Sequence, residues 1–324
     1  MRYAKFIAAC VLGLSTAVLT QPAQAQFSPS QPVTLVVGFA PGGAADIVGR
    51  LIADRLGPHL DGAKVVVENR GGASGNTAAR LIATSTPNGH TILVTTTAIA
   101  VNETLSKDKG YVSSDLRAIS IAAATPDVLV VNPNNPAKTL QEFIANGKKK
   151  SITFGTAGVS TSPYVAAAYF FKELAKIEAV HVPFPGGAPA LNALLGGHID
   201  AVAITLPTPV PHILGGRLRG LAVASAARMS VVPDVPTYQE SGYPGFLHDT
   251  WIGLFVSSKT SDEIATKLNT AINQVLNDKE FQLRLTEIGF QPKPGSLAAA
   301  NDYYRSEIGD WNKMIKQIGL ATDK

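Results

Sequence analysis

A glycine-rich loop at residues 38–46 is the segment best suited to chemistry on a ligand. It follows the apolar, β-branched run 34–39 and precedes apolar residues at helical spacing, so it joins a buried strand to the start of a helix. The first turn of a helix presents unpaired N–H groups and a partial positive charge, which attract anions. Gly42 and Gly43 would let a ligand approach the backbone closely. The loop therefore predicts an anion site, while a glycine turn that only tightens the strand-to-helix connection is the alternative interpretation.

Three further loops of similar composition lie at residues 69–76, 155–162 and 185–187. The loop 155–162 offers hydroxyls and N–H groups but no formal charge. Loops at the carboxyl ends of parallel strands line the crevice in which open α/β sheets bind ligands. None of the loops has the Gly-Lys-Ser/Thr ending of a phosphate loop, and loop 38–46 lacks the spacing of a dinucleotide site. Together they predict a cleft that holds a carboxylate at each end.

Two carboxylates, Asp46 and Asp200, are candidates for the same cleft. Asp46 falls in the first turn of the helix that follows the first loop. A carboxylate there either interacts with the helix dipole and caps the helix or contacts the ligand, and both interpretations stay open.

Catalytic patterns are absent from the sequence. There is no G-x-S-x-G and no H-E-x-x-H, the one S-x-x-K match is Ser106 to Lys109 in a polar stretch, and the six histidines are scattered. The single cysteine, Cys10, lies in the N-terminal segment, so the rest of the chain has no thiol nucleophile and no zinc-thiolate site. We therefore expect no catalytic residues, no metal and no cofactor; the protein is not expected to be an enzyme.

The N-terminus has the three parts of a secretory signal peptide. Arg2 and Lys5 precede an uncharged apolar run at residues 6–19, and Ala23-Gln24-Ala25 is a cleavage pattern. The run is shorter than the roughly 20 residues that span a bilayer, which disfavours an uncleaved anchor. We expect cleavage after Ala25 and a periplasmic protein. The remaining 299 residues carry 26 basic and 24 acidic side chains without a basic stripe, so no nucleic-acid partner is expected.

Strands and helices alternate along the chain in two series, which is the pattern of parallel β-sheets. The fold class is therefore α/β, with two mainly parallel sheets flanked by helices. Crossings near residues 125–131 and 243–250 divide the chain into domain 1, residues 26–126 plus 249–324, and domain 2, residues 127–248. The helical C-terminal segment returns to domain 1.

The ordered loops resemble the Bug/TctC family, the extracytoplasmic solute receptors of tripartite tricarboxylate transporters. The residues that carry the resemblance are 36–43 with Asp46 and Arg50, 68–76, 154–158, 181–184 with Gly186, Gly187, Pro189 and Ala190, 196–200, and 251–254. The resemblance covers essentially the whole chain after the signal peptide, and the order of the motifs makes it specific. Phe184 and Pro185 depart from the family, where a tyrosine and a basic residue are common.

The resemblance implies a two-domain periplasmic binding protein of the Venus-flytrap type, with the ligand in the interdomain cleft. It implies a dicarboxylate, tricarboxylate, aromatic acid or acidic amino acid as ligand, held mainly by backbone N–H groups, hydroxyls and water. The implied partners are the membrane permease subunits of the transporter, and we expect a monomer. A sensory module that serves a signalling partner and a secreted hydrolase are the alternatives.

The ligand-binding residues expected from the loops and the resemblance are Phe39, Gly42, Gly43, Ala44, Asp46, Thr96, Thr97, Thr156, Ala157, Gly158, Ser160, Ser162, Pro185, Gly186 and Asp200.

Overall fold

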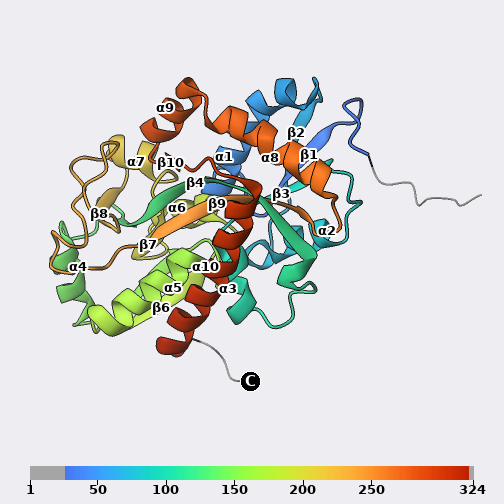
Figure 1. Cartoon of the computed structure of the whole chain (residues 1–324). Helices are drawn as coiled ribbons and strands as arrows, with labels where there is room; N and C mark the ends of the chain where they lie inside the picture. Colours follow the sequence, from blue (N-terminus) through green and yellow to red (C-terminus); the bar gives the residue numbers. More distant parts are fainter. Residues whose placement is uncertain (1–25, 321–324) are drawn as a thin grey trace, which may run out of the picture.

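The computed structural model describes residues 26–320, and the expected signal peptide at residues 1–25 lies outside this range. Its strands form one ten-stranded sheet in which eight follow the order β2-β1-β3-β9-β4-β7-β5-β6, while β8 and β10 each pair with β4 outside this order (Figure 1). Their bounds are β1 Val33–Val37, β2 Val65–Asn69, β3 Thr91–Thr96, β4 Leu116–Val131, β5 Ile152–Thr156, β6 Ala179–Pro183, β7 Ala201–Thr205, β8 Arg219–Val223, β9 Asp249–Ser257 and β10 Gln291–Pro292.

The two βα series produce the two parallel parts of this sheet. Strand β1 pairs in parallel with β2 and β3, and β5 pairs in parallel with β6 and β7. The 16-residue strand β4 runs antiparallel to β9, β7 and β8 and joins the two parts, which the expectation of two separate sheets did not anticipate. The parallel strands are as predicted, and the mixed central region comes from β4 and β9.

Ten α-helices lie along the described residues: α1 Ala44–Leu56, α2 Asn76–Ala83, α3 Ala98–Leu105, α4 Leu140–Gly147, α5 Ser162–Tyr169, α6 Gly187–Leu195, α7 Val210–Leu214, α8 Asp262–Leu276, α9 Lys279–Glu287 and α10 Leu297–Gln317. Helix α5 continues as a π-helical turn at Phe170–Leu174. The predicted cap of α8 is present, since the Ser261 side chain accepts the N–H of Ile264. No helix within residues 26–320 is long and apolar enough to span a membrane.

The pairing partner of β4 changes at one point. Pro126 is the last residue paired with β9, opposite Asp249, and Asp127 is the first paired with β7, opposite Thr205. We propose that this change marks the boundary between the two domains. Below, the first lobe means residues 26–126 and 249–320, and the second lobe means residues 127–248.

Each lobe has apolar cores on both faces of its part of the sheet. In the first lobe, α1 and α8 cover one face and α2, α3 and α10 the other. The side chains of Trp311 and Ile315 place α10 in the second of these cores, so the C-terminal helix packs with the first lobe. In Figure 1, α10 runs down the middle of the molecule between α3 and α5. The cores hold the loops at the strand ends in fixed positions around the space between the lobes.

Candidate functional site

A small pocket lies between the lobes, with a volume of about 30 Å³. The first lobe contributes the start of α1, the end of β3 and the start of β9. The second lobe contributes the loops after β5, β6 and β7. Its lining residues are Phe39, Gly43, Ala44, Ala45, Thr96, Ala157, Thr161, Pro163, Gly187, Ile204, Thr205, Thr208 and Thr250. A ligand of several carbon atoms needs more room than one water, so the lobes must separate for it to enter.

The lining carries no charged side chain. Its polar groups are five threonine hydroxyls and the backbone at the starts of α1, α5 and α6. A pocket of this composition recognises charge through N–H groups and helix dipoles, because no arginine or lysine is available as a clamp.

The three helices that start at the pocket have no side-chain cap, in contrast to four other helices of the described chain. Helices α4, α8, α9 and α10 each have a side chain that accepts an N–H of the first turn. The N-cap residues of α1, α5 and α6, which are Gly43, Thr161 and Gly186, provide no such bond; α2 and α3 also lack one. The first-turn N–H groups at the pocket therefore keep their capacity to bind an anion.

Helix α1 is the strongest of these anion sites. Proline follows the N-cap closely in α5, at Pro163, and in α6, at Pro189, and each removes one N–H from the first turn. The first turn of α1, which begins at Ala44, has no proline. We therefore expect the ligand's carboxylate to lie at the start of α1.

The two lobes meet on both sides of the pocket. On one side, a Cβ built on Gly186 would lie 2.9 Å from Ala40 Cβ of the first lobe. On the other side, the N–H of Ser160 donates to Ser74 Oγ at 3.3 Å, and Ser160 Oγ lies 3.3 Å from Ser106 Oγ. These contacts close the edges of the cleft around the pocket.

A second, larger groove of about 810 Å³ lies between the end of α1 and α8. It is lined only by first-lobe residues, among them Arg55, which pairs with Asp278 and Glu280. Because it includes no residue of the second lobe, movement of the lobes would not close it over a ligand. The interlobe pocket is the better candidate.

Asp46 orders the first glycine-rich loop and does not line the pocket. Its carboxylate accepts the N–H of Gly42 at 2.9 Å, Arg50 Nε at 3.0 Å and Asn69 Nδ2 at 2.8 Å. Burial by itself would raise the pKa of Asp46, but the hydrogen bonds from Arg50, Gly42 and Asn69 outweigh burial and lower the pKa below its ordinary value. In the structure Asp46 neither lines the pocket nor caps the first-turn N–H groups of α1; it holds the loop before the helix through Gly42.

This network predicts a pH dependence of stability. Because the folded-state pKa of Asp46 is lowered, its contribution is present above the unfolded-state pKa of about 3.9 and is lost as the pH falls through the lower folded value. Asp46→Asn should therefore reduce the free energy of unfolding at pH 7 and flatten its decline between about pH 5 and pH 3. Urea unfolding at several pH values tests this, with the exposed Asp302→Asn as control. Parallel curves for wild type and Asp46→Asn would contradict it.

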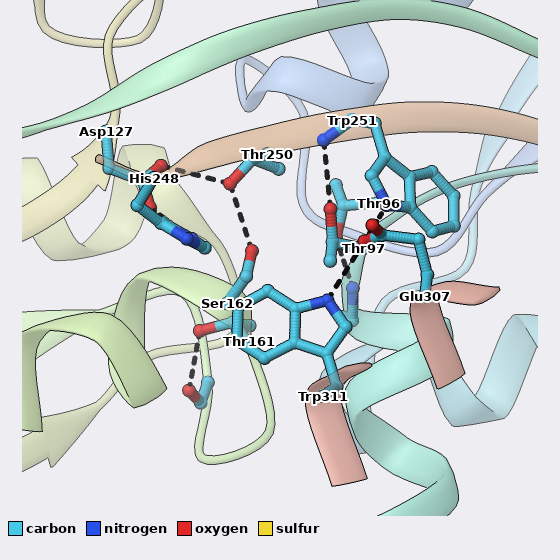
Figure 2. A network of polar contacts seen from close by, with 12 residues as sticks. Thr96, Thr97, Asp127, Thr161, Ser162, His248, Thr250, Trp251, Glu307 and Trp311 are labelled. Carbon is cyan, nitrogen blue, oxygen red and sulfur yellow. Dashed lines mark hydrogen bonds and ion pairs between the residues drawn. The ribbon is translucent and has the colours of Figure 1, made fainter. Parts of the chain in front are cut away.

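A chain of hydrogen bonds runs from the pocket into the crossing between the lobes (Figure 2). Ser162 Oγ lies 3.0 Å from Thr250 Oγ1, and Thr250 Oγ1 donates to Asp127 Oδ1 at 3.0 Å. The other oxygen of Asp127, Oδ2, lies 3.0 Å from His248 Nε2. This chain connects the start of α5 with both segments that cross between the lobes.

Two tryptophans support the first-lobe side of the same region (Figure 2). Thr97 Oγ1 accepts the N–H of Trp251 at 2.9 Å, and the Nε1 atoms of Trp251 and Trp311 both donate to Glu307 Oε2. Thr97, expected to contact the ligand, is fully buried and instead fixes β9 to the end of β3.

The expected ligand-binding residues fall into four groups. Those that line the pocket are Phe39, Gly43, Ala44, Thr96 and Ala157. Those at the closed edges of the cleft are Gly42, Gly158, Ser160 and Gly186. Those behind the lining are Asp46, Thr97, Thr156 and Ser162. Those outside the pocket are Pro185, which is exposed, and Asp200.

The structure places Asp200, expected to be a cleft carboxylate, away from the interlobe pocket. Asp200 precedes β7, whereas the pocket lies beyond the other end of that strand, at Thr205 and Thr208. The Asp200 carboxylate accepts the N–H and the hydroxyl of Thr153, both at 2.8 Å, and holds the starts of β5 and β7 together.

Sequence reasoning missed eight lining residues: Ala45, Thr161, Pro163, Gly187, Ile204, Thr205, Thr208 and Thr250. Thr161, Pro163 and Gly187 lie inside or next to loops that were singled out, so including whole loops would have found them. Thr205 and Thr208 lie at and just after the end of the apolar strand β7, where no glycine-rich loop marks a possible site. Thr250 lies inside the segment that crosses between the lobes.

Two hydroxyl–base candidates, Thr156 with His181 and the Ser106–Lys109 segment, lie outside the pocket lining, whereas the lining hydroxyl of Thr250 donates to the Asp127 carboxylate. Thr156 Oγ1 lies 2.7 Å from His181 Nε2, but Thr156 is fully buried and its hydroxyl donates to the carbonyl of Gly158. Burial lowers the pKa of His181 to about 4, which makes it a weak base. In the S-x-x-K segment, Ser106 bonds to Asn102 while Lys109 pairs with Glu103. Residues 26–320 contain no cluster of three or more side chains suited to a metal.

Residues 48–320 match the family described as "Tripartite tricarboxylate transporter family receptor". The chain belongs to this family. Its members are periplasmic solute-binding receptors.

Protein BugT of Bordetella pertussis is 30% identical over 326 residues, which cover 98% of this chain and 99% of BugT. The structure of R. palustris Rpa4515 with adipate has 31% identity and a TM-score of 0.86, covering 90% of this chain and 98% of that one. MatC from Rhodopseudomonas palustris, with bound malate, has 31% identity and a TM-score of 0.82, covering 89% of this chain and all of that one. The chain thus has the fold of a two-domain periplasmic binding protein.

Proposed function

We propose that this receptor binds one small organic acid anion in the interlobe pocket and delivers it to the membrane permease of a tripartite tricarboxylate-type transporter. The observation that carries the proposal is the set of three helix starts, those of α1, α5 and α6, which meet without side-chain caps at an uncharged pocket. N–H groups and helix dipoles stabilise a carboxylate there. Contacts to both lobes favour the closed arrangement by their differential binding energy.

The ligand classes we propose are dicarboxylates, tricarboxylates, aromatic acids and acidic amino acids. The two similar receptors solved with adipate and with malate support a carboxylate. The pocket lining contains no charged side chain, which is consistent with an anion that is bound by backbone N–H groups. We further propose that the receptor has no catalytic activity of its own, because its family consists of solute-binding receptors.

A screen of carboxylic acids by thermal shift, followed by calorimetry on those that stabilise the protein, tests ligand binding. We expect one-to-one binding of at least one acid, and turnover of none. Uptake of that acid by cells that lack the receptor tests the transport role, and uptake should fall to the background level. Binding without any loss of uptake would favour a sensory role, and binding of sugars or cations in place of acids would contradict the proposal.

The mature protein is proposed to begin at Gln26 in the periplasm. The motivation is the order of charged, apolar and Ala-x-Ala segments within residues 1–25. N-terminal sequencing of the exported protein should give Gln26 as the first residue, and an intact Met1 on the exported protein would contradict this.

A further inference from the structure

One wall of the pocket is formed by neighbouring hydroxyls at the start of α5 and the start of β9. Thr161 and Thr250 line the pocket, and Ser162 lies between them and is fully buried (Figure 2). A hydroxyl has one hydrogen to donate and two lone pairs that accept. The groups that accept these three hydroxyl hydrogens therefore decide whether the wall can donate hydrogen bonds to a ligand or can only accept them.

Protein acceptors take all three hydrogens. Thr161 Oγ1 donates to the carbonyl of Gly158 at 3.0 Å, and a carbonyl oxygen only accepts. Thr250 Oγ1 donates to the carboxylate of Asp127 at 3.0 Å. Because the one hydrogen of Thr250 goes to Asp127, the 3.0 Å contact between Ser162 and Thr250 requires Ser162 to donate. The hydroxyl oxygens of the wall therefore have lone pairs left to accept a hydrogen bond, but no hydroxyl hydrogen left to donate.

The start of α1, on the first-lobe side of the pocket, has the opposite character. Gly43, Ala44 and Ala45 line the pocket there, and the first-turn N–H groups of α1 lack helical acceptors. No side-chain cap accepts them. The pocket therefore combines N–H donors, which include those at the start of α1, with hydroxyl groups of the wall that can only accept.

We infer that the wall formed by Thr161, Ser162 and Thr250 selects carboxylates that also carry a hydroxyl group, whose hydrogen the wall accepts. This inference rests on the proposed function and adds the ligand class. A hydroxyl suits the wall better than an ammonium group, because no carboxylate lines the pocket and a buried cation would face only neutral acceptors. Asp127 acts as a positioning residue: it fixes the direction of the hydroxyl chain from behind Thr250.

Calorimetry with matched pairs of acids tests the inference: succinate against malate, glutarate against 2-hydroxyglutarate, and benzoate against hydroxybenzoate. The hydroxylated member of the pair that fits the pocket should bind about tenfold more tightly, which corresponds to about 1.4 kcal/mol and falls within the net contribution of one hydrogen bond. Glutamate serves as the ammonium-bearing comparison for 2-hydroxyglutarate and should bind more weakly.

Two variants at Thr250 locate the effect. Thr250→Val removes the acceptor and should reduce the preference for the hydroxylated acid to less than about twofold; the preference is the ratio of the two affinities within a pair, so a change that affects both acids equally cancels. Thr250→Ser keeps the hydroxyl chain to Asp127 and should keep the preference, which separates the hydrogen bond from a general effect on folding.

The outcomes separate this inference from the proposed function. Binding of no acid in any pair would refute the proposed function itself. Equal binding within every pair by the wild type, or an undiminished preference in a folded Thr250→Val variant, would overturn the acceptor wall and leave the carboxylate receptor intact. If Thr250→Val does not fold, the wild-type pairs and Thr250→Ser still decide: loss of the preference in Thr250→Ser would also overturn it.

Discussion

Replacing Gly186 with valine is expected to abolish ligand binding while the protein stays folded. The backbone of Gly186 is extended, with φ 164° and ψ 172°, a conformation that any residue adopts. A Cβ at this position would lie 2.9 Å from the Cβ and 3.2 Å from the nitrogen of Ala40, and these close neighbours belong to the other lobe. The valine would therefore collide only when the lobes are together.

Calorimetry and small-angle scattering measure the effect of Gly186→Val. We expect an affinity loss of at least about 100-fold, because a ligand that cannot bridge both lobes loses several charge-assisted hydrogen bonds of about 1.5–3 kcal/mol each. The radius of gyration should stay at the larger, open value when ligand is added. Gly295→Val is the control, because a Cβ there has only one neighbour, at 4.0 Å. Wild-type affinity in Gly186→Val would mean that the ligand does not need the closed arrangement.

Gly43→Val should have an effect of similar size for a different reason. Gly43 is the N-cap of α1, with φ −83° and ψ 169°, so the backbone accepts a side chain. A Cβ there would lie 3.6 Å from the carbonyl oxygen of Ala40 and 3.9 Å from the nitrogen of Gly187. The two methyl groups of valine would then occupy the pocket and cover the N–H groups that we expect to hold the carboxylate.

Arg70→Ala is the variant to compare with Gly43→Val, because it removes a cationic side chain near the pocket without changing the start of α1. The Arg70 side chain is 57% exposed and pairs with Glu68 at 2.6 Å, outside the pocket lining. We expect Gly43→Val to weaken binding by at least about 100-fold and Arg70→Ala to change affinity by less than about twofold. The opposite result, with Arg70→Ala unable to bind and Gly43→Val unaffected, would indicate an arginine clamp.

The loops of the site were predictable because their signal is local. Glycines in loop 38–46 and small hydroxylated residues in loop 155–162 each fall where a strand gives way to a helix, and both loops contribute to the pocket. The parallel strand pairs followed from the same alternation of strands and helices. Order along the chain was enough to place these residues at one edge of the sheet.

The remaining parts depend on pairings between distant segments. Strand β4 has buried residues along almost its whole length, so its apolar sequence does not reveal that its partner changes at Asp127. Thr250 reaches the pocket only because β9 pairs with that strand. Asp200 stands at the start of β7 and not at its end, and this difference of a few residues puts its side chain at the edge of the sheet away from the interlobe pocket.

The central claim is that the interlobe pocket holds one small organic acid anion through the start of α1. Native mass spectrometry of wild-type protein and of Gly43→Val, each purified from the periplasm without added ligand, tests it most directly. We expect the wild type to carry a single organic acid, identified after denaturation, and the folded variant to carry none. Equal occupancy of the two proteins, or a bound cation, sugar or nucleotide in the wild type, would contradict it.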